Sequence, residues 1–253
     1  MLDVLISLNI FHFFMVAARI GGAIMLFPGF SATYVPMRVR VLVTLMISLV
    51  VVFSVSDLLP PLPNRPGEMF RLLGIELLAG VFMGVMSRII IGALQTAGTI
   101  VSLTSAMANA FTMDAVTAEQ GAIVTSFLMT VAMTLIFVTD LHHLMLIAVV
   151  DSYTLFLPGV TPSVGDMANL VTDKVAEAFV LGVRLAGPYL VLSITYNLGL
   201  GLMTRLMPSL PVFFVAMPLQ LLGSIFLMMV VLPGIMLVYL PEFQATFTAF
   251  MEP

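Results

Sequence analysis

The sequence predicts an all-α, polytopic membrane protein. Of its 253 residues, 61% are hydrophobic and only 9% are charged, and the mean hydropathy is +1.18. Soluble domains are about 45–50% apolar, so this is the composition of an integral membrane chain. Its apolar runs reach the ~20 residues that a membrane-spanning helix needs. We expect about six apolar helical regions in a single membrane domain, residues 1–253, with no soluble domain.

The first half of the chain holds three apolar runs. Predicted helices cover residues 4–27, ended by Pro28-Gly29, and residues 41–55. Four prolines within residues 60–66 then impose a stiff, extended turn, because proline cannot continue a helix. Residues 69–110 are too long for one ordinary span. They predict either two helices or one long helix that leaves the membrane plane.

The second half repeats this alternation of apolar runs and breaks. Residues 123–138 and 144–157 predict a hairpin or a bent helix, interrupted by Asp140, His142 and His143. Residues 158–166 form the clearest interior linker. Two further helices are expected over 170–202, bent near Gly187-Pro188, and over 212–240. Arginines flank successive turns almost equally, so the positive-inside rule does not decide the orientation.

Several charged residues interrupt the apolar runs. Arg19, Glu76, Arg88, Glu177 and Arg184 all lie in stretches that otherwise resemble membrane spans. A charge in hydrocarbon costs several kcal/mol, so each must face protein, water or another charge. The chain also has no tryptophan and only five tyrosines, which leaves a weak aromatic belt at the membrane interfaces. Both observations favour a surface that contacts other protein subunits more than lipid.

Glu76, Gly80, Gly84 and Arg88 follow one another at i+4 spacing. They therefore share one face of a helix, and the two glycines allow another helix backbone to approach closely. The sequence does not decide whether that helix belongs to the same chain or to another subunit. Glu177 and Arg184 also share a face, which favours structural charge pairing over a proton relay.

The residue types exclude most kinds of chemistry. Without cysteine there is no disulfide and no thiolate site, and Lys174 is the single lysine, so no basic patch is present for nucleic acid. The adjacent His142 and His143 would point about 100° apart on a helix and so could not share a metal ion. No nucleophile–base pair is apparent, which argues against an intramembrane hydrolase. We expect no catalytic residues, no cofactor and no metal.

An ordered set of short motifs covers nearly the whole chain and resembles the family of the flagellar biosynthetic protein FliR, together with its injectisome relatives, the export-apparatus T-family. The residues that carry this resemblance are Arg19-Ile20-Gly21-Gly22, Pro28, Pro36, Arg38-Val39-Arg40, Glu76, Gly80, Gly84, Asp114, His142, Asp151-Ser152, Ala186-Gly187-Pro188, Asn197-Leu198-Gly199-Leu200-Gly201, Arg205, Pro208 and Pro218.

The resemblance implies a non-enzymatic subunit of the type III protein export gate. Such a subunit would assemble with FliP and FliQ family subunits in the bacterial inner membrane, at the flagellar basal body, around a conduit for unfolded exported proteins. An FlhB family protein would dock outside and rod components at the distal end. Residues 1–157 would be FliP-like and residues 167–253 FliQ-like. The alternatives are an injectisome T-family subunit and, from another class, a secondary transporter, which would need related halves.

The resemblance also implies a plug in the closed channel. The sequence departs from the common family pattern at Ala106, Ala115, Leu141 and Ser209. Considered by themselves, residues 109–114 favour a passive turn, and the alternative is a segment that lies across a cavity without regular structure. The residues carried over to the plug are Ala106, Asn109, Ala110, Phe111, Thr112, Met113 and Asp114. Those expected to provide buried charge and close packing are Arg19, Glu76, Gly80, Gly84, Arg88, Glu177, Arg184 and Arg205.

Overall fold

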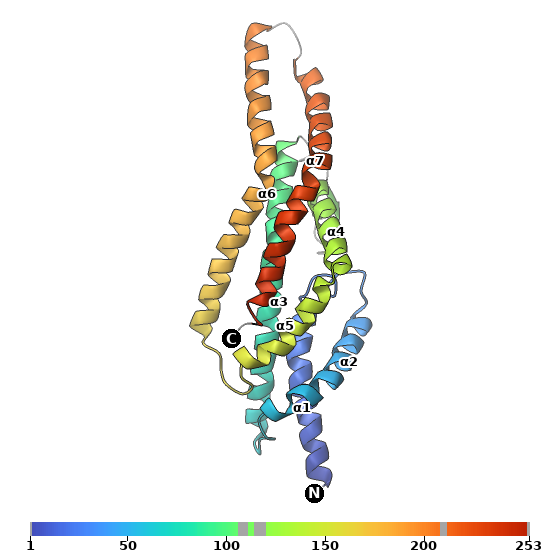
Figure 1. Ribbon diagram of the computed structural model, residues 1–253, viewed down its shortest axis with the longest axis vertical. Helices are drawn as coiled ribbons and strands as arrows, with labels where there is room; N and C mark the ends of the chain where they lie inside the picture. The colour runs from blue at the N-terminus through green and yellow to red at the C-terminus, as the bar shows by residue number, and fades with distance from the viewer. Residues whose placement is uncertain (1, 106–110, 114–119, 208–211, 252–253) are drawn as a thin grey trace. The chain divides into compact units, whose positions relative to one another are not determined.

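A computed structural model of the chain describes residues 2–105, 111–113, 120–207 and 212–251, and within them it contains seven α-helices (Figure 1). These are α1 (Leu2–Ile24), α2 (Met37–Val55), α3 (Pro66–Thr104), α4 (Ile123–Val138), α5 (Leu141–Leu155), α6 (Val164–Leu206) and α7 (Val212–Thr248). A 3₁₀ turn, η1 (Ser56–Leu58), follows α2. The prediction of an all-α chain is confirmed.

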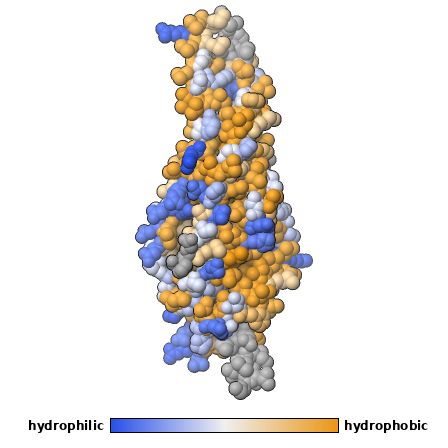
Figure 2. Space-filling model, viewed as in Figure 1, coloured by the Kyte–Doolittle hydropathy of each residue, from blue (hydrophilic) through white to orange (hydrophobic). Residues whose placement is uncertain are grey.

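The apolar helices are long enough to make this a polytopic membrane protein. Four segments could cross a membrane by length and composition: Met37–Leu58, Pro66–Thr104, Val164–Leu206 and Ala216–Thr248. The broken pair α4 and α5 would make a fifth span if it is counted as one. Hydrophobic residues cover much of the face drawn in Figure 2. This agrees with the composition of the chain.

Some helix boundaries differ from the predicted ones, at prolines and at a capping serine. One continuous helix of 39 residues, α3, occupies most of the segment that could have been two. It begins at Pro66, because proline is favoured in the first helical position. α2 begins at Met37, directly after the extended Pro36, which is earlier than predicted. α6 also begins early, at Val164, where the Ser163 hydroxyl accepts a hydrogen bond from the backbone N–H of Asp166.

A short antiparallel ribbon lies between α3 and α4. Strand β1 (Phe111–Met113) pairs with β2 (Gln120–Ala122), with Thr112 opposite Gly121. Residues 111–113 therefore do not follow the alternative of a segment without regular structure, since their backbone groups find partners in a second strand. The remaining expected plug residues, Ala106, Asn109, Ala110 and Asp114, lie outside the described residues.

The chain divides into two compact units that are not contiguous in sequence. The first unit contains residues 1–89, 136–174 and 243–253, and the second contains residues 90–135 and 175–242. Aromatic pairs fill the core of the first unit: Phe27 packs edge-on against Phe247, and Phe82 against Phe156 and Phe250. The units cut across the division into residues 1–157 and 167–253, which stays a prediction about the relationship to FliP and FliQ.

Candidate functional site

The first unit contains a fully buried ion pair, between Arg19 of α1 and Glu76 of α3. Both side chains have zero exposure, and the Nε–H of Arg19 donates to Oε2 of Glu76 at 2.7 Å. In a membrane chain an isolated buried charge of this kind would be strongly unfavourable, so each side chain needs the other. Both residues therefore face another charge, which is one of the three surroundings that the sequence allowed for them.

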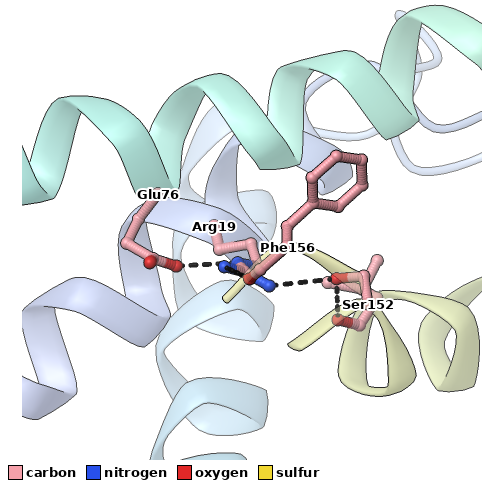
Figure 3. Close-up of polar contacts among 5 residues, drawn as sticks. Arg19, Glu76, Ser152 and Phe156 are labelled. Carbon is pink, nitrogen blue, oxygen red and sulfur yellow. Dashed lines mark hydrogen bonds and ion pairs between the residues drawn. The ribbon is translucent and has the colours of Figure 1, made fainter. Parts of the chain in front are cut away.

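The arginine extends this pair to a third helix, α5. Its Nη1 donates to the hydroxyl oxygen of Ser152 at 3.2 Å, and its Nη2 donates to the carbonyl oxygen of Phe156 at 2.8 Å (Figure 3). The guanidinium carbon also lies 3.7 Å from the centre of the Tyr153 ring, which is a cation–π contact. We call these five residues, Arg19, Glu76, Ser152, Tyr153 and Phe156, the arginine clamp.

The local fold of α5 supplies the acceptors for this clamp. Phe156 follows the last residue of α5 with a non-helical backbone (φ −104°, ψ 84°), although its own N–H still donates to the carbonyl of Ser152. A carbonyl at a helix C-terminus has no partner inside the helix and carries partial negative charge, which favours a cation such as Arg19. The Ser152 hydroxyl donates in turn to the carbonyl of Val149, which leaves its oxygen free to accept from the arginine.

Close packing of α1 on α3 surrounds the clamp. A Cβ placed on Gly80 would lie 1.9 Å from the carbonyl oxygen of Arg19, and one on Gly84 would lie 2.6 Å from Cβ of Leu26. On the α1 side, a Cβ on Gly22 would lie 2.9 Å from the carbonyl oxygen of Leu77. Gly80 and Gly84 therefore serve packing within the chain, which is one of the two alternatives that the sequence left open.

The other charges expected to be buried are exposed. Arg88, although exposed, donates to the Leu26 carbonyl at 3.3 Å and to the Ser31 hydroxyl at 3.2 Å. Glu177, Arg184 and Arg205 lie on exposed positions of α6. These four charges are exposed in the single chain, and their expected burial against partner subunits stays a prediction.

Side-chain-to-backbone bonds join the helices of the second unit. The Tyr189 hydroxyl of α6 donates to the Ser224 carbonyl of α7 at 3.1 Å, and the Gln220 amide of α7 donates to the carbonyl of Thr104 at 2.9 Å. Thr104 is the last residue of α3, so Gln220 satisfies one of the carbonyls that a helix end leaves unpaired.

The second unit also contains an apolar cavity of about 360 Å³ near the end of α3 and the start of α4. Ser105 and Ile123, which bracket the segment expected to form the plug, both line it. The rest of its wall is largely apolar side chains of α3, α4 and α7, among them Val101, Phe127 and Met228. Tyr189 of α6 and Ser224 of α7 also line it, and the Tyr189 hydroxyl is already bonded to the Ser224 carbonyl.

Sequence reasoning missed three members of the clamp. Ser152 belongs to a motif that carries the family resemblance, but nothing in the sequence marked it as a partner of Arg19. Tyr153 and the Phe156 carbonyl gave no signal, because they lie more than 130 positions from Arg19 and only the fold brings them there.

Comparison with known proteins decides the family of this chain. The family model described as bacterial export proteins, family 1, matches residues 10–246. The flagellar biosynthetic protein FliR of Caulobacter vibrioides is 34% identical over 230 residues, which cover 91% of this chain and 92% of that protein. This chain belongs to the FliR family of bacterial export proteins. FliR of Bacillus subtilis is 26% identical over 92% of the chain and 91% of its own length, and FliR of Escherichia coli K12 is 28% identical over 81% and 78%.

Family membership shows in what kind of protein the arginine clamp lies. This FliR-family chain is a membrane protein of the flagellar export apparatus and a type III export subunit. The clamp joins α1, α3 and the end of α5 through one guanidinium. These contacts stabilise the packing of the three helices.

Proposed function

We propose that this FliR-family chain is a non-enzymatic subunit of the flagellar type III protein export gate. It assembles with FliP and FliQ family subunits in the bacterial inner membrane, within the flagellar basal body, around a conduit for unfolded flagellar proteins. An FlhB family protein docks on the outside of this assembly, and rod components join it at the distal end. In this assembly residues 1–157 occupy a FliP-like position and residues 167–253 a FliQ-like position.

The observation that carries this proposal is the exposed face of α6. Arg184 lies near the middle of this 43-residue helix and is exposed, with Val180, Val191 and Ile194 exposed on the same helix at 65%, 67% and 61%. An arginine at the centre of a lipid bilayer costs about 2.5–3.5 kcal/mol even on the most lenient scale. Neighbouring subunits that offer apolar side chains and hydrogen-bond acceptors remove that cost, and lipid tails do not.

Large exposed apolar surfaces on other helices support the same assembly. In the most apolar stretch of α7 only 17% of the residues are buried, and in that of α2 and η1 only 22%. Phe214 and Leu237 of α7 are exposed at 84% and 74%. Such surfaces are compatible with lipid or with protein partners. With Arg184 among the exposed residues of the second unit, we favour protein partners for that unit.

The plug is a further part of this proposal. Residues 106–114 come two positions after the end of α3 at Thr104, and Ser105 before them and Ile123 at the start of α4 line the apolar cavity of the second unit. In the closed gate these residues block the conduit, with Phe111 and Met113 as the bulky members. They leave the path when rod components or an exported protein displace them.

Co-purification tests the assembly. The chain carries an affinity tag and is expressed with its FliP and FliQ family neighbours, then extracted in mild detergent and sized by chromatography with light scattering. We expect a stable hetero-oligomer that contains all three proteins. Elution of the tagged chain as a monomer or a small homo-oligomer, with both neighbours present in the membrane, contradicts the proposal.

A pair of arginine variants locates the interface in the same experiment. Arg184→Leu keeps the apolar bulk but removes the cation, which leaves its acceptors on a neighbour unpaired, a loss of about 2–5 kcal/mol at a buried interface. We expect less hetero-oligomer from this variant. Arg65→Gln removes another exposed arginine, in the proline-rich turn before α3, and serves as the matched control with unchanged assembly. Equal yields from both variants would place the interface elsewhere.

A further inference from the structure

The junction of α4 and α5 brings three potential metal ligands together. Asp140 lies in the two-residue break between the helices, and His142 and His143 lie in the first turn of α5, all within the first unit. One ligand atom from each of these side chains lies within 4.8 Å of the other two. This is the one such group of three histidine or acidic residues in the part of the chain that the structure describes.

The two histidines do not diverge as the sequence predicted. Their ring centres lie 4.1 Å apart with an angle of 35° between the ring planes. The expectation assumed two side chains fixed on a helical surface, but the first turn of α5 has no preceding turn against which they would pack. Phe137 stacks on the ring of His142 at 4.9 Å and fixes its position.

The distances approach those of a metal centre. Oδ1 of Asp140 lies 3.4 Å from Nδ1 of His143. Ligand bonds of about 2.0–2.1 Å in a tetrahedral zinc site place neighbouring ligand atoms about 3.3 Å apart. The distance between the Asp140 and His143 ligand atoms is therefore already suitable. The distances from these atoms to a ring nitrogen of His142 are at most 4.8 Å, and side-chain rotation shortens them to the required length. The exposed fractions of 64% for His143 and 75% for Asp140 leave both side chains room to rotate.

Two further observations indicate that these groups are available for a ligand. Asp140 is the N-cap of α5, yet its carboxylate makes no capping bond, and it is the one non-glycine residue with positive φ (58°) among the described residues. Strained backbone of this kind concentrates at functional sites. Nδ1 of His142 is buried, and no described residue gives it a hydrogen-bond partner.

We infer that Asp140, His142 and His143 bind a divalent transition metal ion of the zinc class. Two imidazoles and one carboxylate favour zinc, cobalt, nickel or copper over calcium and magnesium, which prefer oxygen ligands alone. Three protein ligands leave at least one position for water or for a group from a neighbouring molecule. The positive end of the α5 dipole opposes the cation, and the charge of the Asp140 carboxylate compensates for it.

A bound metal ion would fix the first turn of α5 relative to the break between α4 and α5. His142 and His143 belong to the helix, and Asp140 belongs to the break. This role is independent of the proposed export-gate assembly, since all three ligands belong to one chain.

Metal titration of the full chain in detergent tests the inference. The purification tag must contain no histidine, because a polyhistidine tag binds the same ions. Zinc affinity is measured by competition with a chromophoric chelator, and the number of coordinated nitrogens by electron paramagnetic resonance of the copper-loaded protein. We expect about one ion per chain with two nitrogen ligands, as the donor set requires.

Two variants test the ligands, and a third is the control. Asp140→Asn keeps a residue type that tolerates positive φ, and His143→Gln alters an exposed side chain, so both should fold. Each should weaken zinc binding by at least about tenfold, the lower end of the range for changes around a metal site. His12→Gln alters the remaining histidine, whose ring contacts the Pro60 carbonyl outside this cluster, and should bind zinc as the unaltered chain does. The inference is overturned if Asp140→Asn and His143→Gln retain that affinity, or if the copper spectrum shows fewer than two nitrogens.

Discussion

Replacement of Arg19 by methionine should be one of the most destabilising single changes in this protein. Methionine keeps most of the apolar volume but removes the guanidinium that binds Glu76, Ser152 and Phe156. Breaking a buried ion pair on one side costs about 3–5 kcal/mol, because the remaining charge stays buried without compensation. The abandoned Glu76 carboxylate has zero exposure, and its second oxygen, Oε1, already has no partner among the described residues. We therefore expect a loss toward the upper end of this range.

Two companion variants separate charge from shape. Arg19→Lys retains a cation for Glu76, but a lysine cannot reproduce the planar fork that reaches Ser152 and Phe156. Each hydrogen bond made by a charged group contributes about 1.5–3 kcal/mol, so Arg19→Lys should be intermediate. The double variant Arg19→Met with Glu76→Leu removes both charges, and it should recover much of the stability lost by Arg19→Met alone.

The assay is denaturant unfolding of the purified chain in detergent micelles, arranged as a double-mutant cycle. Neighbouring residues in one network show coupling of about 0.5–3 kcal/mol, and we expect the pair to reach the top of this range. The reasoning is refuted if Arg19→Met lies within about 1 kcal/mol of the unaltered protein, the usual size of a mutational effect. It is also refuted if the losses from Arg19→Met and Glu76→Leu simply add in the double variant.

Two further predictions concern packing and gating. Gly80→Ala forces α1 away from α3, because its Cβ would lie 1.9 Å from the Arg19 carbonyl oxygen, and it should lower unfolding stability by at least about 1–3 kcal/mol, the cost of overpacking. Gly92→Ala, in the same helix with open space around it, is the control and should be neutral or stabilising by about 0.5–1 kcal/mol. Deletion of residues 109–113 should make the assembled gate leak ions, measured as membrane conductance, and unchanged conductance would count against the plug.

The amino-acid sequence was sufficient to predict the fold class and the approximate places of the helices. Apolar runs of membrane length and proline-rich breaks are local signals, and the predicted span 123–138 matches α4, while the span 41–55 matches α2 except for its earlier start at Met37. The sequence also marked Arg19 and Glu76 as charges that need a partner. It could not pair them, because one charge in an apolar run resembles another until the fold brings two of them together.

The glycines of α3 illustrate why the rest could not be predicted. Gly80 lies against the backbone of α1 and Gly84 against the Leu26 side chain just after α1, whereas a Cβ on Gly74 or Gly92 would meet nothing within 4 Å. All four occur in the same helix, and the i+4 spacing indicated close packing at Gly80 and Gly84 but not which helix approaches them. What distinguishes them is the crossing point of α1, which depends on contacts between residues about 60 positions apart.

The contrast between Arg19 and Arg184 indicates what this chain needs from other molecules. Arg19 has its carboxylate, hydroxyl, carbonyl and aromatic ring within the first unit, so its charge is already compensated before any partner binds. Arg184 is exposed in the middle of an apolar helix, and no hydrogen bond or ion pair to it is found among the described residues. If Arg19 stabilises the fold of the subunit and Arg184 binds a neighbouring subunit, loss of Arg19 should lower the unfolding stability of the isolated chain. Loss of Arg184 should lower only the yield of hetero-oligomer. The two variants therefore separate folding of the subunit from assembly of the gate.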